Sequence, residues 1–326
     1  MNILVTGAAG YIGSVVVNEL IQNNHAVVAL DDLSLGHKNA IHPQATFVQA
    51  DLSAYNQIEK VFLTNSIDAV IHLAGQSLVG ESMQNPGKFF RANIINGLNV
   101  LEAMHHNGVH KFVFSSTAAV YGEPQQVPLT EDSACNPINP YGASKLYFEK
   151  ILPWYLSAYG IKYMILRYFN AAGATDTLGE SHPVESHLIP IILETALGLR
   201  PALELFGADY DTKDGSCVRD YIHVSDLATA HIKALAHIEQ PQHRVYNLGI
   251  GHGYSNIEVL EAARKVTGVS IPSTLSPRRP GDPPILIANA DRARSELGWT
   301  PHHQKIEPIV ESAWLWRVNH PTGYID

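Results

Sequence analysis

The sequence predicts an α/β protein built on a doubly wound parallel sheet, with a smaller C-terminal α/β substrate domain. Three observations support this: apolar or β-branched runs alternate with helical segments, a glycine-rich turn follows the first run, and the alternation breaks off near residue 170. The predicted strands cover residues 3–5, 27–30, 46–48, 69–73, 112–115 and 163–166. Strands separated by helices run parallel and are covered on both faces, so a ligand should bind at their carboxyl ends.

The break in this alternation predicts a domain boundary. A stretch rich in Gly, Pro and His over residues 171–183 is followed by a predicted helix over 187–199. We therefore expect a first, nucleotide-binding domain over residues 1–172 and a second, substrate-binding domain over residues 173–326. The βα pattern resumes later, so parts of residues 218–250 are expected to return to the first domain.

Composition excludes several classes of function. The chain has 326 residues, of which 45% are hydrophobic and 16% charged, with a net charge of -9. An acidic protein offers no basic field to nucleic acid or to an anionic membrane surface, and no apolar stretch approaches the ~20 residues of a membrane span. The start of the chain shows no basic leader or cleavage site, and Cys135 and Cys217 lack the density of a disulfide scaffold. We expect a cytoplasmic protein with two free thiols.

The seventeen histidines do not predict a metal site. The closest cluster consists of His105, His106 and His110, at the end of a predicted helix, and His302 and His303 form a second pair. Neither group has an acidic or cysteine partner nearby in the sequence that would complete a ligand set. We therefore expect no metal.

The first strand ends in the segment TGAAGYIGS, in which Gly7, Gly10 and Gly13 precede a helical run. Glycines at such a turn let backbone amides and the helix N-terminus approach a pyrophosphate. The alternative is that the three glycines serve tight packing only.

Asp31 ends the second predicted strand and favours a binding site for NAD. Its carboxylate would accept hydrogen bonds from the adenosine ribose hydroxyls and repel the 2′-phosphate of NADP. Asp32, rather than Arg or Lys, follows it. Asp51, after the third strand, would reach the adenine, although a helix N-cap explains it equally well.

The segment YGASK places Tyr141 and Lys145 four residues apart, on one face of a helix. A tyrosine, with an ordinary pKa near ~10, becomes a base at neutral pH only if a neighbouring cation stabilises its phenolate. Lys145 would supply that cation, and the alternative is a pair of surface neighbours. Thr117 closes a predicted strand at a point where its hydroxyl would face the substrate, whereas Ser115 and Ser116 would be partly structural or cap a turn.

With these elements in place, the sequence resembles the extended short-chain dehydrogenase/reductase family, and within it the UDP-sugar 4-epimerases. The resemblance covers nearly the whole chain and includes the motifs SLVGES, SSTAAVYGE, NPYGASK, LRYFNAAGA, HLIP, VRDYIHVSDLA and RRPGD. It implies a Rossmann-like fold, bound NAD, Tyr141 as the base, and Lys145 and Thr117 as its catalytic partners. The cofactor contacts that it implies are Gly7, Gly10, Tyr11, Ile12, Gly13, Asp31, Asp32, Leu33, Ser34, Gly36, Asp51, Leu52, Leu73, Ala74, Gly75, Ser77, Ser115, Tyr141, Lys145 and Phe169.

The resemblance also implies a UDP-sugar site. Its residues would be Thr117, Tyr141, Asn170, His187, Leu188, Glu204, Leu205, Phe206, Arg219, Tyr221, Arg279, Asp282 and Leu286. Two arginines suit a diphosphate in an acidic protein, because each guanidinium donates forked hydrogen bonds. The alternative for Arg219 is an ion pair with Asp220 or Asp226.

Some positions depart from the family pattern. Ala8 stands where relatives often have a second glycine, and Val15 stands where they often have His. Ser77 replaces a nucleotide-contacting Lys of some members, and Ala92 replaces a frequent Asn. None of these changes touches the pair of Tyr141 and Lys145.

The expected activity is the interconversion of UDP-galactose and UDP-glucose through a 4-keto intermediate, in galactose metabolism, by a homodimer. A 4,6-dehydratase would need an acid and a base after Thr117, where this chain has Ala118 and Ala119. The sequence is also compatible with an epimerase for N-acetylated or uronic-acid sugars and with a non-catalytic dinucleotide-binding protein. Leu286 would line the pocket around the sugar C2 substituent and favour the sugars without an acetamido group.

Overall fold

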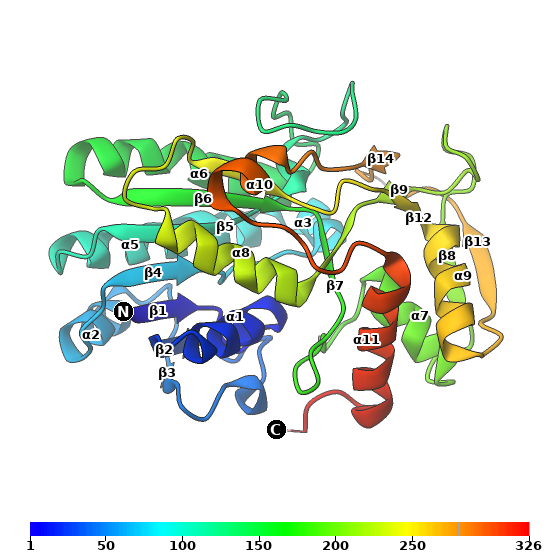
Figure 1. The fold of residues 1–326 in the computed structure, drawn as a ribbon, viewed down its shortest axis with the longest axis horizontal. Helices are drawn as coiled ribbons and strands as arrows, with labels where there is room; N and C mark the ends of the chain where they lie inside the picture. Colours follow the sequence, from blue (N-terminus) through cyan, green and yellow to red (C-terminus); the bar gives the residue numbers. More distant parts are fainter. Residues whose placement is uncertain (280, 326) are drawn as a thin grey trace.

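A seven-stranded parallel sheet forms the centre of the protein, as the computed structural model of residues 1–279 and 281–325 shows (Figure 1). Its strand order is β11-β6-β5-β4-β1-β2-β3. The doubly wound sheet predicted from the sequence is therefore confirmed. Its strands are β1 (Asn2–Thr6), β2 (Ala26–Asp31), β3 (Thr46–Gln49), β4 (Ala69–His72), β5 (Lys111–Thr117), β6 (Lys162–Tyr168) and β11 (Val245–Leu248).

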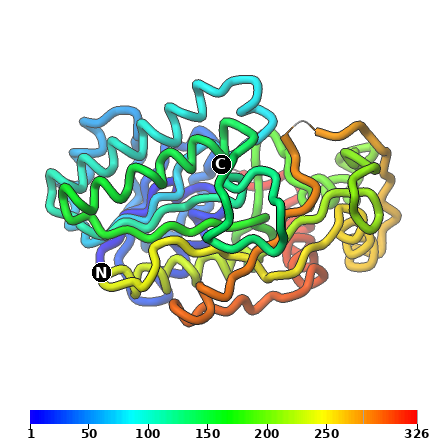
Figure 2. The backbone as a smooth tube through the Cα atoms, turned by 90° about the horizontal axis from the view of Figure 1, so that it is seen from above, coloured from blue at the N-terminus to red at the C-terminus, as the bar shows by residue number. Residues whose placement is uncertain are grey.

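Helices cover both faces of this sheet, which explains why its central strands are apolar at nearly every position. Alternate side chains of β1 enter different cores: Ile3 and Val5 pack in one cluster and Leu4 in the other. Helices α1 (Tyr11–Gln22) and α8 (Val224–Ala236) contribute to the first core. The second core is covered by α2 (Tyr55–Thr64), α5 (Asn96–His106) and α6 (Pro140–Tyr159), and Figure 2 shows the two helical layers from above.

The chain order of the strands reverses at β1, which pairs with β2 on one side and with β4 on the other. The loops after β1 and β4 therefore leave the sheet in opposite directions and open a crevice at their carboxyl ends. Short elements follow these strand ends: η1 (Lys38–Ala40), α3 (Val79–Gln84), α4 (Pro86–Phe90), the π-helical turn η2 (Arg91–Ile95) and η3 (Ala118–Val120).

A second, smaller layer of structure lies beyond the carboxyl end of the sheet (Figure 1). Its core is built from apolar side chains of three helices, α7 (Leu188–Ala196), α9 (Asn256–Thr267) and α11 (Ile306–Asn319). Three small sheets accompany it. They pair β7 (Asn170–Ala172) with β10 (Tyr221–His223), β8 (Leu203–Phe206) with β13 (Ser273–Ser276), and β9 (Val218–Arg219) with both β12 (Tyr254–Ser255) and β14 (Ile285–Leu286).

Two elements from the middle of the second half lie against the large sheet. Strand β11 pairs in parallel with β6, and α8 packs on α1. Helix α10 (Asp291–Leu297) contacts both of them. We propose to keep the division into residues 1–172 and 173–326, with these elements assigned to the first domain.

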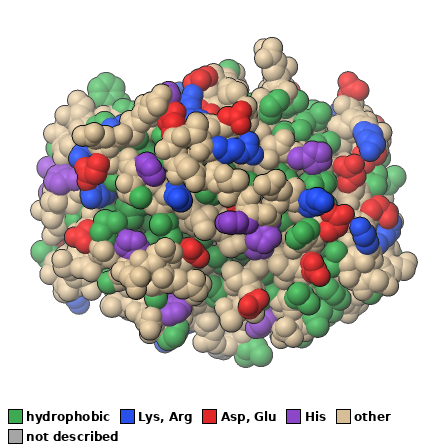
Figure 3. All heavy atoms as spheres, in the orientation of Figure 1, with side chains coloured by type: hydrophobic (Ala, Val, Ile, Leu, Met, Phe, Trp, Pro, Cys, Tyr) green, Lys and Arg blue, Asp and Glu red, His purple; other side chains and the backbone are tan. Residues whose placement is uncertain are grey.

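The charged side chains on the surface, the two cysteines and the helix lengths can each be compared with what the composition predicts. Figure 3 shows acidic and basic side chains interspersed on the face that it draws. Cys135 and Cys217 are both free thiols. Among the described residues, no helix is both long enough and apolar enough to cross a membrane.

Candidate active site

The turn between β1 and α1 requires glycine at two positions. Gly7 has φ +72°, and a Cβ there would lie 2.6 Å from the backbone nitrogen of Ala74. A Cβ on Gly13 would lie 1.9 Å from the carbonyl oxygen of Gly7. Close packing therefore explains these two glycines and brings the N-terminus of α1 against the end of β1.

Gly10 is the N-cap residue of α1 and leaves the amides at the start of the helix accessible. A Cβ at Gly10 would meet only the Gly7 carbonyl oxygen, at 3.4 Å, so the space beyond it is open. Within the described chain, no side chain caps this helix and no acidic residue stands in its first turn. An uncapped helix N-terminus beside open space suits a pyrophosphate, and close packing alone does not account for this opening.

Asp31, the last residue of β2, is held in a fixed position beside this turn. Its Oδ2 accepts a hydrogen bond from the amide of Ala9 at 2.9 Å, and its Oδ1 accepts one from the amide of Leu33 at 2.9 Å. Burial raises the pKa of Asp31 above its ordinary value, although these backbone hydrogen bonds oppose the shift. A carboxylate has about four acceptor sites, which leaves capacity for two ribose hydroxyls.

Asp51 does not cap a helix, so that alternative is wrong. Helix α2 begins at Tyr55 with Ala54 at the N-cap position. The carboxylate of Asp51 instead accepts hydrogen bonds from the amide and the hydroxyl of Ser53, each at 2.8 Å, and closes a turn after β3. Asp32 closes a similar turn by accepting from the amide of Ser34 at 2.8 Å.

The other residues predicted for the cofactor lie at the same edge of the sheet. Tyr11 also links the two halves of the chain, because its hydroxyl donates to the carbonyl oxygen of Gly173 at 2.5 Å. By element, Ile12 stands in the first turn of α1, Gly36 follows β2, Leu52 follows Asp51, Leu73, Ala74, Gly75 and Ser77 follow β4, and Phe169 follows β6.

Lys145 is buried between helix α6 and strand β5. Only 4% of the residue is exposed, its Nζ donates to the carbonyl oxygen of Ser115 at 3.0 Å, and it lies 5.0 Å from the ring centroid of Phe114. A Cβ on Gly75 would lie 3.2 Å from this Nζ. Burial lowers the pKa of Lys145 to about 8, although Glu149 opposes the shift. Lys145 is therefore no surface neighbour, and that alternative is wrong.

Tyr141 lies one helical turn before Lys145 and faces the end of β5. Helix α6 starts in this orientation because Asn139 caps it, accepting from the amide of Gly142 at 2.8 Å. Burial raises the pKa of Tyr141, and a hydrogen bond with Thr117 lowers it. The Thr117 hydroxyl also accepts from the amide of Ala119 at 3.1 Å, so it caps the next turn as well.

Behind these groups lies a buried polar network that was not predicted from the sequence. Glu149 follows Lys145 by one helical turn and binds Arg167 of β6 in a fork, with contacts of 3.0 Å to Nε and 2.5 Å to one terminal nitrogen. The hydroxyl of Ser116 donates to the same carboxylate, and the hydroxyls of Ser115 and Tyr168 are hydrogen-bonded to each other. Ser115 and Ser116 thus have a structural role here.

Asn93 is a further residue that was not predicted from the sequence. It is buried in the π-helical turn η2, donates to the hydroxyl of Ser144 at 2.9 Å, and exchanges hydrogen bonds of 2.8 and 3.0 Å with the backbone of Gln76. It ties the loop after β4 to the face of α6 that carries Tyr141 and Lys145. The Ala92 that precedes it leaves this link intact.

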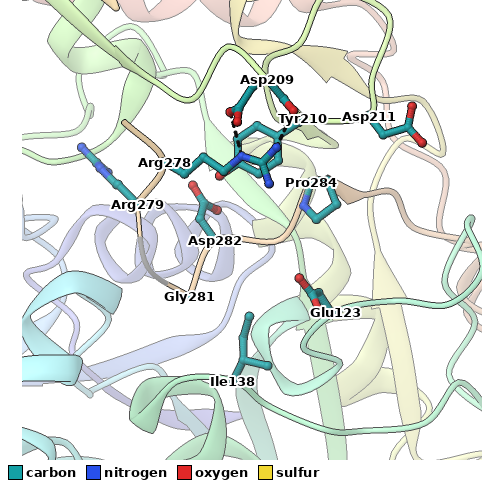
Figure 4. A pocket seen from close by; sticks show the side chains of 10 residues that line it. All are labelled: Glu123, Ile138, Asp209, Tyr210, Asp211, Arg278, Arg279, Gly281, Asp282 and Pro284. Carbon is teal, nitrogen blue, oxygen red and sulfur yellow. Dashed lines mark hydrogen bonds and ion pairs between the residues drawn. The ribbon is translucent and has the colours of Figure 1, made fainter. Parts of the chain in front are cut away.

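A cavity of about 450 Å³ opens between loops of the second layer and the segment before α6 that carries Glu123 and Ile138 (Figure 4). Arg279 and Asp282 line it together with Arg278, which was not among the predicted site residues. The Arg279 guanidinium lies 4.0 Å above the ring of Phe206. Arg278 lies 4.1 Å above the ring of Tyr210 and donates to Asp209 at 2.7 Å. Stacking on aromatic rings holds both cations at the cavity.

Arg219 forms an ion pair with Asp282, so the alternative of a pair with Asp220 or Asp226 is wrong. Asp220 instead accepts three backbone amides, at 2.8, 2.9 and 3.1 Å. Asp226 accepts the amides of His302 and His303 at 2.9 and 3.0 Å. Burial lowers and Asp282 raises the pKa of Arg219, and its net direction is upward. The guanidinium is therefore a permanent cation near the cavity.

The remaining residues predicted for the substrate lie on β7 and β10, at the start of α7 and on β8. Asn170 and Tyr221 are paired across β7 and β10, and His187 and Leu188 begin α7. On β8, Glu204 is exposed, whereas the side chain of Leu205 packs into the core among the helices. The side chain of Leu205 is therefore not available to a ligand.

Leu286 lies in β14, in a buried apolar cluster with Ala118, Leu146 and Phe169. Two of these neighbours follow Thr117 and Lys145 directly in the sequence. The side chain is thus close to the catalytic strand end.

Comparison with known proteins gives a consistent result over the full length. A family model described as the NAD dependent epimerase/dehydratase family matches residues 3–249. The UDP-glucose 4-epimerase of Lacticaseibacillus casei is 50% identical over 329 residues, covering 100% of this chain and 99% of that protein. A solved UDP-glucose 4-epimerase superimposes with a TM-score of 0.96 at 44% identity, covering 100% of both chains. The enzyme from Bifidobacterium longum, in complex with NAD+ and UDP, has a TM-score of 0.95 at 37% identity, with 99% and 100% covered.

Proposed function

Because this chain belongs to the NAD dependent epimerase/dehydratase family, we propose that it interconverts UDP-galactose and UDP-glucose with NAD as its cofactor. The observation that carries the proposal is the convergence of Tyr141, Thr117 and Lys145 at the end of β5. These three residues lie at the same edge of the sheet as the glycine turn that fits a pyrophosphate. The whole chain also matches UDP-glucose 4-epimerases.

We assign the cofactor to the edge of the sheet at β1 and β2. The amides at the start of α1 would hold the pyrophosphate, and Asp31 would accept from the adenosine ribose. Lys145, beside Gly75, would donate to the nicotinamide ribose. When bound there, NAD would supply a hydride acceptor and donor for the sugar C4.

Tyr141 acts as the base and then as the acid in this proposal. Its phenolate takes the proton of the 4-hydroxyl as the sugar becomes a 4-keto intermediate, and its phenol returns a proton after the sugar has turned. Burial opposes the phenolate, so a cation has to stabilise it, and Lys145 lies one helical turn away. Thr117 orients the reacting oxygen through the hydroxyl that already bonds Tyr141.

The nucleotide half of the substrate is assigned to the 450 Å³ cavity and its surroundings. Arg219 and Arg279 would bind the diphosphate, and Asp282 would accept from the uridine ribose. The keto-sugar has to turn while UDP stays anchored, so binding energy should reside mainly in the nucleotide. Arginines held by stacking and by an ion pair suit that anchoring role.

Elimination of water finds no support at this site. Ala118 and Ala119 follow Thr117 in the turn η3 and offer no acid or base. A dehydratase would need both groups within reach of the sugar C5 and C6.

We further propose a homodimer that associates through α5 and α6. Large apolar side chains are exposed on α6, where Tyr147 is 50% and Trp154 74% exposed, and just before α5, where Ile95 at the end of η2 is 50% exposed. Light scattering should give the mass of two chains for the native protein and of one chain for Trp154→Glu. A monomeric native protein would refute this assembly.

The two free thiols support a cytoplasmic location.

The activity is tested with purified protein and no added cofactor or reductant. UDP-galactose should be converted to UDP-glucose up to a fixed equilibrium ratio. Denatured protein should release NAD in excess of NADP, because Asp31 repels the additional phosphate. Conversion that depends on added reductant, or release of mainly NADP, would contradict the proposal.

A further inference from the structure

The loop between β7 and α7 gathers four side chains outside the catalytic groups. Glu180, His182, Glu185 and His187 each direct one ligand atom inward, and these atoms all lie within 4.8 Å of one another. The sequence drew attention to other histidines as metal ligands and not to this set. The four residues lie in a segment without regular structure. Neither a helical nor a strand period therefore indicates that their side chains converge.

The spacing of the ligand atoms is close to that of a tetrahedral site. His187 Nδ1 lies 2.8 Å from Glu180 Oε1 and 3.0 Å from Glu185 Oε1. His182 Nδ1 lies 3.3 Å from Glu185 Oε2 and 3.5 Å from Glu180 Oε1. With bonds of about 2.0–2.2 Å to zinc, the edges of a ligand tetrahedron measure about 3.3–3.6 Å. The two contacts of His187 would have to lengthen by about 0.3–0.8 Å to reach these edges, whereas the two contacts of His182 already fall near them.

The charges of the cluster also need a compensating positive charge. The side chains of Glu180 and Glu185 are only 9% and 4% exposed. Within residues 1–279 and 281–325, their ion pairs are made only with the two imidazoles. Two buried carboxylates beside neutral imidazoles would leave two uncompensated negative charges, which is costly. Either two protons on the imidazoles or one divalent cation removes that cost.

Glu185 is already oriented for coordination. Its Oε1 accepts the amides of Ser186 and His187, both at 2.8 Å, which fix the carboxylate as outer hydrogen bonds do in metal sites. The turn closes next to the first residue of α7, so a bound ion would pin the start of that helix.

We propose that Glu180, His182, Glu185 and His187 bind one divalent transition-metal ion, with zinc as the best match to two imidazoles and two carboxylates. Four protein ligands leave no open position, so the ion is structural and takes no part in the reaction. It fastens the loop that joins the two layers and stabilises the folded state by mass action.

The test uses tag-free, full-length protein stripped with a chelator and titrated with Zn²⁺ by calorimetry and with Co²⁺ by visible absorption. We expect one ion per chain, a Kd of about 1 μM or tighter, the intense absorption of four-coordinate cobalt, and a rise in Tm with Zn²⁺. Glu185→Gln and His182→Asn should each weaken binding by more than the roughly 10–100-fold that outer hydrogen-bond partners cost. The double variant His105→Asn, His106→Asn removes another histidine pair, with ring centroids 5.5 Å apart, and should bind as the native protein does.

Absence of binding up to millimolar Zn²⁺ would overturn the proposal and leave protons as the counter-charge. Equal loss of binding in the His105 and His106 control would also overturn it, because the ion would then sit on the surface. If Glu185→Gln does not fold, the more exposed His182→Asn still decides the question. No UDP-sugar is present in these measurements, so their outcome is independent of the proposed function.

Discussion

Lys145 donates a hydrogen bond from its buried ammonium group to the backbone carbonyl oxygen of Ser115, over 3.0 Å. This contact ties helix α6 to the end of β5. It thereby fixes the position of Tyr141 on α6 relative to Thr117 at the end of β5. It also places a cation in a buried environment, where charge interactions are stronger than in water. The position of one lysine therefore links the fold to the proposed acid–base chemistry.

Replacing Lys145 with Ala should lower turnover and move the alkaline rise of activity to higher pH. Burial already raises the pKa of Tyr141, and loss of the nearby cation raises it further, so the phenolate forms only at higher pH. The measurement is the pH dependence of kcat. Lys150→Ala, on the exposed side of the same helix, is the control and should keep the native profile. An unshifted profile for Lys145→Ala would refute the coupling.

Tyr141→Phe should keep the fold and the affinity for UDP but lose about 10²–10⁴-fold in kcat, the usual contribution of a positioned acid–base group. Thermal unfolding, UDP titration and a turnover assay separate these effects. Tyr147→Phe, on the same helix and half exposed, provides the matched control. Substantial residual turnover in Tyr141→Phe would assign the base elsewhere.

The ion pair between Glu149 and Arg167 should matter more for stability than any exposed pair. Glu149→Leu leaves the guanidinium buried without its partner and should cost about 3–5 kcal/mol in the free energy of unfolding. The double variant Glu149→Leu, Arg167→Met removes both charges and should recover much of that loss. Denaturant unfolding measures both variants. A double variant that is no more stable than Glu149→Leu would show that the pair is not the cause.

Leu286 should set the preference at the sugar C2 position. Its branched side chain leaves less room than Ala and more than Tyr, and displacement of the sugar by about an ångström can cost ~100-fold in rate. We expect Leu286→Ala to improve kcat/KM for UDP-N-acetylglucosamine relative to UDP-glucose, and Leu286→Tyr to reduce it. If Leu286→Ala leaves the ratio unchanged, Leu286 does not line the C2 pocket.

The parts of the site that were predictable from the sequence are those with local causes. Gly7 and Gly13 follow from the geometry of one turn, and Tyr141 and Lys145 follow from the period of one helix. The strands were predictable because burial on both faces makes them continuous apolar runs. Each of these signals lies within a few residues of the chain.

The parts that were not predictable depend on contacts between distant segments. Glu149 and Arg167 lie on a helix and on a strand, and Arg219 pairs with a carboxylate 63 residues away in the sequence. Charge alone does not select among candidate partners, which is why the alternative partners considered for Arg219, Asp220 and Asp226, were the wrong ones. The cluster from Glu180 to His187 is local, but an irregular loop has no period from which convergence could be read.

The central claim is that the hydrogen at the sugar C4 leaves and returns within one site. The direct measurement is to convert UDP-galactose that carries deuterium at C4, in ordinary water, and to locate the label in the product by NMR. We predict UDP-glucose with deuterium still at C4, since the bound acceptor returns the hydride that it took. Product with hydrogen from the solvent at C4 would contradict this claim, because the reaction would then proceed by proton exchange.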